Sequence, residues 1–361
     1  MDHSGRQRRL QDALAQNKLD WLLVTHLPNI RYLCGFTGSA GTLLINGRGA
    51  TFFTDGRYRT QARAEVSGAR IITARKSPAL AAAEFLAGSP SRTAQRLGLE
   101  PHTVTIGQRE QLSAVLRRKW KLVSAPPLIE RARMVKDREE IRFIRAAVQV
   151  GAGLFQIARR KIRPGVKELE VAAAMEYEAR RAGAESMSFS TIIAAGRRSA
   201  VVHGRASDAR IPRRGFVVCD FGVILAGYCS DRTRTVHVGP PTKDARQMYQ
   251  AVLEAQQAAI AQVRPGATAA SIDAAARKVL RKHNLARYFS HSTGHGLGLE
   301  IHEAPRLAAG QSQELHPGMV ITIEPGAYIP GKQGVRIEDV VVVTSAGCEV
   351  LTPTGKELIV I

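Results

Sequence analysis

Apolar and polar positions alternate with two different periods along the first third of the chain. Some segments repeat apolar residues at helical spacing, and others are short apolar runs typical of strands. Asn46-Gly47 separates two of those runs and predicts a tight hairpin turn. The expected helices are 8–17, 77–87 and 109–119, and the expected strands are 21–24, 42–45, 50–54, 70–72 and 103–106. This pattern predicts an α/β domain at the N-terminus.

A turn is expected after the strand 21–24, and the segment 29–41 ends in the glycine-containing stretch Gly35–Gly41. It has no Walker lysine and does not fit the dinucleotide-binding pattern, so a tight or flexible loop is expected and not a phosphate cradle.

A pair of prolines, Pro126-Pro127, marks the expected domain boundary, because proline interrupts both helices and central strands. The predicted domains are therefore 1–125 and 126–361. The second domain opens with a long predicted helix, 137–162, which ends at Arg163-Pro164-Gly165.

The second domain contains an internal duplication. Arg163-Pro164-Gly165 aligns with Arg264-Pro265-Gly266, and each triplet is preceded by a long helical pattern and followed by another, at 167–182 and 271–283. The strand-like runs 214–220 and 316–324 then end in Asp220 and Glu324. Each half therefore ends a corresponding strand in a carboxylate.

Each half also supplies a second carboxylate, Asp231 and Glu338, on a returning strand. Because side chains alternate across a strand, Asp220 and Glu324 can point into one cleft while their neighbours pack into the core. Four crowded carboxylates repel at neutral pH. Two divalent cations would offset that charge, whereas one ion would leave an excess.

Composition and cysteine usage fit an ordinary globular protein. Hydrophobic residues make up 44% and charged residues 23%, the first twenty residues have no secretory pattern, and no apolar run approaches the ~20 residues that span a bilayer. The four cysteines lack metal-binding spacing and are expected to be reduced and buried. We expect a soluble cytoplasmic protein that does not associate with membranes.

The net charge of +21 raises the question of nucleic-acid binding. The basic residues are scattered in small groups without interleaved aromatic residues or a nucleic-acid-binding motif. We therefore expect a solvated basic surface and no specific recognition of nucleic acid.

Five short motifs in the second domain carry Asp220, Asp231, His295, Glu324 and Glu338. They are Val218–Gly222, Gly227–Thr235, Gly294–Gly298, Thr322–Gly326 and Val335–Asp339. Residues 137–361 resemble the metallopeptidase family of methionine aminopeptidases, aminopeptidase P and prolidases. That resemblance implies an α/β (α+β) fold with a pseudo-symmetric pita-bread catalytic domain after the N-terminal α/β domain.

The resemblance implies a role for each of these five residues. Asp220 and Asp231 would hold one metal ion, His295 and Glu324 the other, and Asp231 and Glu338 would bridge both. A water between the ions would attack the peptide carbonyl, and Glu324 would act as the general base. The oxygen-rich donor set favours Mn²⁺, with Co²⁺ or Zn²⁺ as alternatives.

Several neighbouring residues also match positions in the family. His203 and His302 would stabilise the reacting carbonyl as catalytic and substrate-binding residues. His291 and Tyr328 match the proline-cleaving branch and would help bind substrate.

Two further matches, Tyr228 and Arg336, would contact the metal ligands without binding the metal ions themselves. Arg336 is expected to orient Glu338 and balance its charge. Arg306 would bind the C-terminal carboxylate of a dipeptide or lie on the surface as an ordinary arginine.

The N-terminal domain, together with 29–38 and 54–58, resembles the proline-cleaving branch. A bond before proline has no amide hydrogen, so a ring-shaped pocket must replace that contact. We expect an Xaa-Pro aminopeptidase acting on peptides, with Xaa-Pro dipeptidase (prolidase) as the alternative. A metal-free binding module of the same fold is less expected because the five ligand-type residues are present.

We also expect a homodimer in which the loop Gly35–Gly41 lies near the active-site cleft of the partner. This expectation comes from the two-domain relatives and not from composition.

Overall fold

The computed structural model describes residues 1–88, 95–116 and 119–361, and its internal contacts divide it into two units, Met1–Arg133 and Met134–Ile361. The division falls at the end of α6 (Leu128–Met134), one short helix after the proline pair. Helix α6 is tied to the first unit because Arg133 Nη1 donates to Asn29 Oδ1 at 2.6 Å, and Asn29 Nδ2 donates to Glu130 at 2.7 Å.

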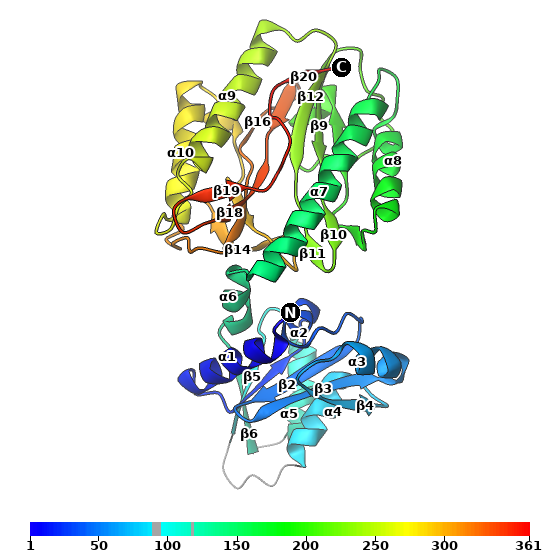
Figure 1. Cartoon of the computed structure of the whole chain (residues 1–361), viewed down its shortest axis with the longest axis vertical. Coiled ribbons are helices and arrows are strands. Elements are labelled where there is room, and N and C mark those ends of the chain that lie inside the picture. Colours follow the sequence, from blue (N-terminus) through cyan, green and yellow to red (C-terminus); the bar gives the residue numbers. More distant parts are fainter. Residues whose placement is uncertain (89–94, 117–118) are drawn as a thin grey trace. The chain divides into compact units, whose positions relative to one another are not determined.

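The first unit is built on a six-stranded mixed sheet in the order β4-β3-β2-β1-β5-β6 (Figure 1). Strands β1, β2 and β3 pair antiparallel, whereas β4, β5 and β6 join in parallel. The strands are β1 (Trp21–Val24), β2 (Gly41–Asn46), β3 (Gly49–Asp55), β4 (Arg70–Ala74), β5 (Gln95–Leu99) and β6 (Trp120–Ser124). The helices are α1 (His3–Gln16), α2 (Leu27–Cys34), α3 (Arg59–Glu65), α4 (Pro78–Ala87) and α5 (Ile106–Leu116).

Local sequence explains most of this first unit. Asn46 closes the β2–β3 hairpin as predicted, since its Oδ1 accepts from the backbone N–H groups of Arg48 and Gly49. The expected strand at 103–106 is wrong: this segment turns into α5, and the strand is β5. Helix α2 occupies the part of the chain after β1 where a turn was expected, and it is capped by Gly35, whose φ of 84° suits glycine.

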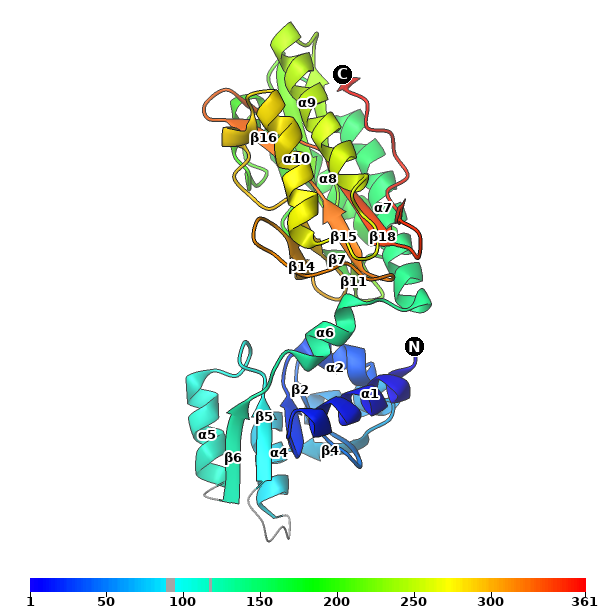
Figure 2. The same ribbon diagram turned by 90° about the vertical axis from the view of Figure 1, so that its left-hand side faces the viewer.

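The second unit contains two pairs of long helices, α7 with α8 and α9 with α10, which flank the strands (Figures 1 and 2). The helices are α7 (Arg138–Lys161), α8 (Glu168–Arg181), α9 (Lys243–Ile260) and α10 (Ala269–Lys282). The strands of the first half are β7 (Ser186–Met187), β8 (Ile192–Ala195), β9 (Gly215–Asp220), β10 (Val223–Leu225), β11 (Tyr228–Cys229) and β12 (Thr233–Val238). Those of the second half are β13 (Gly294–Gly296), β14 (Glu303–Leu307), β15 (Val320–Ile323), β16 (Gly326–Ile329), β17 (Gln333–Arg336), β18 (Asp339–Val343) and β19 (Cys348–Val350). The last strand, β20 (Ile359–Val360), joins the first half by pairing in parallel with β12.

The predicted duplication is present in three dimensions. Gly165 and Gly266 both have positive φ, 87° and 77°, and both donate their N–H to an equivalent carbonyl, that of Ile211 and of Leu315, at 2.9 Å. Strands β9 and β12 pair antiparallel, as do β15 and β18. The two halves thus repeat the same helix-turn-helix and hairpin plan, which confirms the pseudo-symmetric fold.

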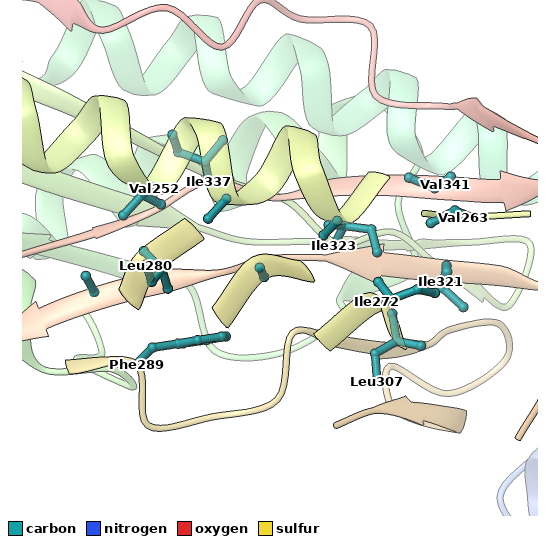
Figure 3. Close-up of a cluster of buried hydrophobic side chains, with 14 of the residues drawn as sticks. Val252, Val263, Ile272, Leu280, Phe289, Leu307, Ile321, Ile323, Ile337 and Val341 are labelled. Atoms are coloured by element: carbon teal, nitrogen blue, oxygen red, sulfur yellow. The ribbon is translucent and has the colours of Figure 1, made fainter. Parts of the chain in front are cut away.

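Each half has its own hydrophobic core. In the second half, side chains of α9 and α10 such as Val252 and Ile272 pack against Ile321 and Ile323 of β15 (Figure 3). In the first half, Leu154 and Phe155 of α7 pack with Val217 and other residues of β9. These cores fix the strands whose ends carry the predicted ligands.

Helix α7 is the one helix among the described residues that is long and apolar enough to cross a membrane by length and composition. Several of its apolar side chains, including Ile144, Leu154 and Phe155, are buried in the protein. Packing within this unit therefore accounts for the apolar residues at these buried positions of α7.

Candidate active site

The five predicted ligands come from the corresponding strands of both halves. Asp220 ends β9 and Asp231 precedes β12, while Glu324 follows β15 and Glu338 precedes β18. His295 lies in β13, which pairs with β15. The duplicated hairpins therefore bring four carboxylates and one imidazole to one place.

The geometry of this cluster is tight. Carboxylate oxygens of Asp220, Asp231 and Glu338 lie within 4.8 Å of one another. His295 Nε2 is 3.4 Å from Glu324 Oε1 and 3.6 Å from Asp231 Oδ2. The imidazole thus connects the fourth carboxylate to the other three.

The chain itself balances only part of the charge of the four carboxylates. Burial and the neighbouring carboxylates raise the pKa of Asp231 and Glu338 well above their usual range, and burial raises the pKa of Glu324 to about 8. Within the described residues, the buried atoms Asp220 Oδ1 and Glu338 Oε1 have no hydrogen-bond partner. Unpartnered buried carboxylate oxygens facing one another fit divalent cations.

His295 is held in the form that a metal ligand needs. Its Nδ1 lies 2.9 Å from the Gly296 carbonyl oxygen, which can only accept, so Nδ1 carries the proton. The lone pair of Nε2 therefore points to Glu324 and Asp231. Burial lowers the pKa of His295 to about 4, which keeps the ring neutral.

Arg336, in β17 of the second half, forms hydrogen bonds with residues of the first half at the site. Its Nη2 donates to Asp220 Oδ2 at 2.5 Å, and its Nε donates to Thr233 Oγ1 at 3.1 Å. Thr233 Oγ1 in turn donates to Glu338 Oε2 at 2.8 Å. Arg336 therefore pairs directly with Asp220 and reaches Glu338, its expected partner, only through Thr233.

A second chain of hydrogen bonds runs from Arg336 to His291. Arg336 Nη1 donates to the Tyr328 hydroxyl at 2.7 Å. His291 Nδ1 donates to the Ser292 carbonyl at 2.8 Å, so its Nε2 accepts from the Tyr328 hydroxyl at 2.9 Å. Burial and the positive charge of Arg336 lower the pKa of His291 to about 3, and the ring is neutral.

The cluster opens into a pocket of about 680 Å³ in the second unit. His203 and His302 line it and are exposed. The His302 ring meets the ring of His295 edge to face at 4.4 Å. Partial burial and nearby His203 lower the pKa of His302. The remaining wall is mixed apolar and polar, with Phe189, Ser190, Ile192, Val202, Arg205, His291, Ser292, Ile301, Glu303 and Arg306.

The other predicted site residues have separate positions. Arg306 lines the pocket and is exposed. Tyr328 is buried behind His291, which it contacts through its hydroxyl. Tyr228 donates its hydroxyl proton to Glu140 at the start of α7.

The cysteines are unpaired thiols. Burial raises the pKa of Cys34, Cys219 and Cys229 to about 12. Cys348 is only partly buried, so the expectation that all four are buried is wrong at this position, because β19 is an edge strand.

Sequence reasoning gave no role to several residues that shape the site. Thr233 and Thr322 stand inside the quoted motifs: Thr233 contacts Glu338, and Thr322 Oγ1 accepts from the His295 N–H at 3.0 Å. Their place in the alternating strand pattern was the available signal. Phe189 and Arg205 lie outside the five ligand motifs and were not identified.

Comparison with known families covers both units. The model of the Creatinase/Prolidase N-terminal domain matches residues 6–135, and that of Metallopeptidase family M24 matches residues 142–345. The second match includes all five clustered residues.

Proteins similar to almost the whole chain are found among both protein sequences and solved structures. The chain is 38% identical over 353 residues to the Xaa-Pro dipeptidase of Pyrococcus horikoshii, covering 98% of each protein. The structure of the Xaa-Pro dipeptidase from Bacillus anthracis covers all of both chains, with a TM-score of 0.94 and 39% identity. The X-Pro aminopeptidase of Thermotoga maritima has a TM-score of 0.88 and 33% identity, covering 99% of this chain and 100% of that one. These similarities favour the dipeptidase alternative over the aminopeptidase that we expected first. The chain belongs to metallopeptidase family M24, whose peptidases depend on divalent metal ions, and it carries the N-terminal domain of the creatinases and prolidases.

Proposed function

We propose that the protein is an Xaa-Pro dipeptidase that uses two divalent metal ions. The observation that carries the proposal is the convergence of Asp220, Asp231, His295, Glu324 and Glu338 at one pocket. The whole-chain similarity to Xaa-Pro dipeptidases supports the choice of substrate.

The same five side chains would hold the ions. Asp231 and Glu338 would lie between them, Asp220 would complete one site, and His295 with Glu324 would complete the other. Mn²⁺ suits this mainly oxygen donor set, and Co²⁺ or Zn²⁺ are the alternatives. When bound, the ions supply positive charge that lowers the pKa of the attacking water and polarises the scissile carbonyl.

Glu324 is the proposed general base. It borders the pocket and lies beside His295, and burial already raises its affinity for a proton. In the reaction it accepts the proton of the attacking water and returns it to the proline nitrogen as the C–N bond breaks.

His203 and His302 are proposed to bind the reacting carbonyl. Both line the open pocket, and the lowered pKa of His302 keeps it a neutral N–H donor. Such donors stabilise the negative charge that develops on the carbonyl oxygen.

His291 is proposed to form part of the proline pocket. Its ring is fixed by Tyr328 and the Ser292 carbonyl, so it presents a rigid, uncharged surface. A rigid wall suits the proline ring, which has no amide hydrogen to be recognised. Tyr328 acts here through His291, and Arg306 would bind the terminal carboxylate.

We also propose a cytoplasmic homodimer in which Gly35–Gly41 approaches the site of the partner. The unpaired cysteines support a reducing compartment. A monomeric mass by light scattering, measured on fully active enzyme, would contradict the dimer.

Substrate length tests the proposed function. Metal-loaded protein should hydrolyse Ala-Pro faster than Ala-Pro-Ala, and removal of metal by a chelator should abolish both activities. Faster cleavage of the tripeptide would favour the aminopeptidase, and no cleavage of either peptide by metal-loaded protein would reject both.

A further inference from the structure

Arg205 is an exposed arginine on the wall of the substrate pocket. Together with Arg306 it brings two guanidinium groups to the same 680 Å³ pocket. Within the described chain, no side-chain hydrogen bond or ion pair is present at either guanidinium. By contrast, Arg336, which lines the same pocket, is buried and forms an ion pair with Asp220.

The backbone that carries Arg205 is firmly held. The Arg205 carbonyl accepts from Arg198 Nη2 at 2.8 Å, and Arg198 Nε is paired with the buried Glu168 at 3.0 Å. Glu168 also accepts from the Ser207 N–H at 3.1 Å and from its hydroxyl at 2.7 Å. The backbone at Arg205 is therefore held in place, while the Arg205 guanidinium remains available to a ligand.

The charges around the pocket leave these arginines in excess. Glu303, which also lines the pocket, is paired with Lys136 at 3.1 Å. The other acidic residues of the lining are the four proposed metal ligands, whose charge two bound divalent ions would offset. The uncompensated charge at the pocket wall is therefore positive, and it would attract an anionic group of the substrate.

The chain position of Arg205 indicates which substrate group it meets. Arg205 lies two residues after His203, and the Arg205 N–H donates to the His203 carbonyl at 2.9 Å. His203 is proposed above to bind the reacting carbonyl, and the proline ring is attached to that carbonyl through its nitrogen. An Xaa-Pro dipeptide has a free carboxylate one bond beyond the proline ring, whereas a longer peptide has an uncharged amide there.

We propose that Arg205 determines substrate length by binding, with Arg306, the free C-terminal carboxylate of the dipeptide. This inference rests on the proposed dipeptidase function. Arg205 acts on affinity for the carboxylate and takes no part in the proton transfers. A guanidinium can make two parallel hydrogen bonds to one carboxylate, which gives directional recognition.

The test compares Ala-Pro with Ala-Pro-amide on metal-loaded enzyme, because the amide differs only in lacking the carboxylate charge. The variant Arg205→Met keeps most of the apolar stem and removes the charge. We expect the KM for Ala-Pro to rise about tenfold, the equivalent of one lost charged contact. KM for the amide and kcat for both substrates should change less than about twofold.

Two further variants serve as controls. Arg205→Lys keeps the charge without the planar fork and should recover part of the affinity for Ala-Pro. Arg213→Met removes an exposed arginine of the same segment that does not line the pocket, and it should leave all parameters unchanged.

An equal change of KM on both substrates, or no change on Ala-Pro, would overturn the role of Arg205 while leaving the dipeptidase intact. A selective loss on Asp-Pro relative to Ala-Pro would also overturn it, because Arg205 would then bind an acidic first residue. If wild-type enzyme hydrolyses neither Ala-Pro nor its amide, the proposed function fails and the inference falls with it.

Discussion

At Glu324, replacement of one carboxylate oxygen by an amide nitrogen tests the proposed chemistry of the site. Glu324 is buried beside His295 and is the proposed base. Glu324→Gln should lower kcat for Ala-Pro by about a thousandfold, because general acid–base groups contribute on the order of 10² to 10⁴. Binding of Ala-Pro, measured by calorimetry on metal-loaded protein, should change only a few-fold.

Metal content must be measured on the same sample, since Glu324 is also a proposed ligand. The exposed Glu349, which pairs with Arg145 on the surface, offers a control, and Glu349→Gln should keep full activity. A Glu324→Gln protein with normal metal content and near-normal kcat would remove the base assignment.

Replacement of two buried arginines that are close in sequence, Arg232 and Arg234, should change the free energy of unfolding in opposite directions. Arg232 is 2% exposed, and none of its guanidinium nitrogens has a hydrogen-bond partner within the described residues. Burial and the nearby charge of Arg234 lower the pKa of Arg232 to about 9. Replacement by a similar apolar side chain, Arg232→Met, should raise the free energy of unfolding by about 1 kcal/mol.

Arg234 is the matched comparison. Its Nη2 pairs with the buried Asp339 at 2.7 Å, and its Nε donates to the Gly355 carbonyl. Arg234→Met should lower the free energy of unfolding by about 3 kcal/mol because it breaks a buried ion pair. Urea unfolding of both variants measures the difference, and a destabilised Arg232→Met protein would show that the Arg232 guanidinium is satisfied in solution.

At this scale the sequence identified the clustered residues but not all of their contacts. Alternation along corresponding strands allows Asp220 and Glu324 to point into one cleft, which predicts that they lie close together. It does not predict that Arg336 selects Asp220 and not the closer neighbour in sequence, Glu338. That choice depends on how β17 crosses the strands of the other half, which no local pattern specifies.

Among single elements, helix α7 has the best-defined beginning. Asp137 Oδ1 accepts from the N–H groups of Glu139 and Glu140, each at 2.9 Å, and Glu140 Oε2 accepts from the Asp137 N–H at 3.0 Å. Asp137→Ala should lower the free energy of unfolding by about 1 kcal/mol, the usual value of an N-cap. It should leave kcat unchanged, since Asp137 lines no part of the pocket.

Asp244, in the first turn of α9, provides the comparison for Asp137. The N-cap of α9 is Thr242 and not Asp244. Asp244→Ala should therefore lower the midpoint of urea unfolding much less than Asp137→Ala does. Equal losses in the two variants would mean that helix dipole charge and not the capping box accounts for the effect.

The long helix α7 was predictable from the sequence, whereas the short helix α2 was not. The expected helix 137–162 and α7 agree closely because its apolar period persists over many turns and proline ends it. Helix α2 has only eight residues, and Pro28 in its first turn marked its start without enough periodic positions to predict it. The expected strand at 103–106 failed because Val104 lies in the turn before α5 and Ile106 is the first residue of that helix.

For the whole molecule, metal should couple the two halves of the catalytic unit. The clustered carboxylates come from strands β9 and β12 of one half and β15 and β18 of the other. Binding to the folded state stabilises a protein by about 3 kcal/mol when free ligand exceeds Kd a hundredfold. Chelation should therefore lower Tm by several degrees, and Mn²⁺ should restore it.

A variant separates this effect from nonspecific ion binding. Asp231→Asn removes a proposed bridging ligand, so its Tm should not respond to Mn²⁺. A response equal to that of the wild type would place the stabilising ion elsewhere.

The duplicated architecture was visible in the sequence because both halves keep the same order of Arg-Pro-Gly, helix, strand and carboxylate. The pocket was not, because its wall combines segments such as Phe189–Ser190 and Ile301–His302, whose meeting depends on how the two halves fold together. Spacing along the chain contains little information about such contacts.

The central claim is that two metal ions at this cluster drive hydrolysis of an Xaa-Pro dipeptide. The most direct measurement titrates metal-free protein with Mn²⁺ while following bound metal by elemental analysis and the rate of Ala-Pro hydrolysis on the same samples. The account predicts no activity without metal and a rate that reaches its maximum at two bound ions per chain. Full activity in metal-free protein, or binding of two ions without any hydrolysis of Ala-Pro, would contradict it.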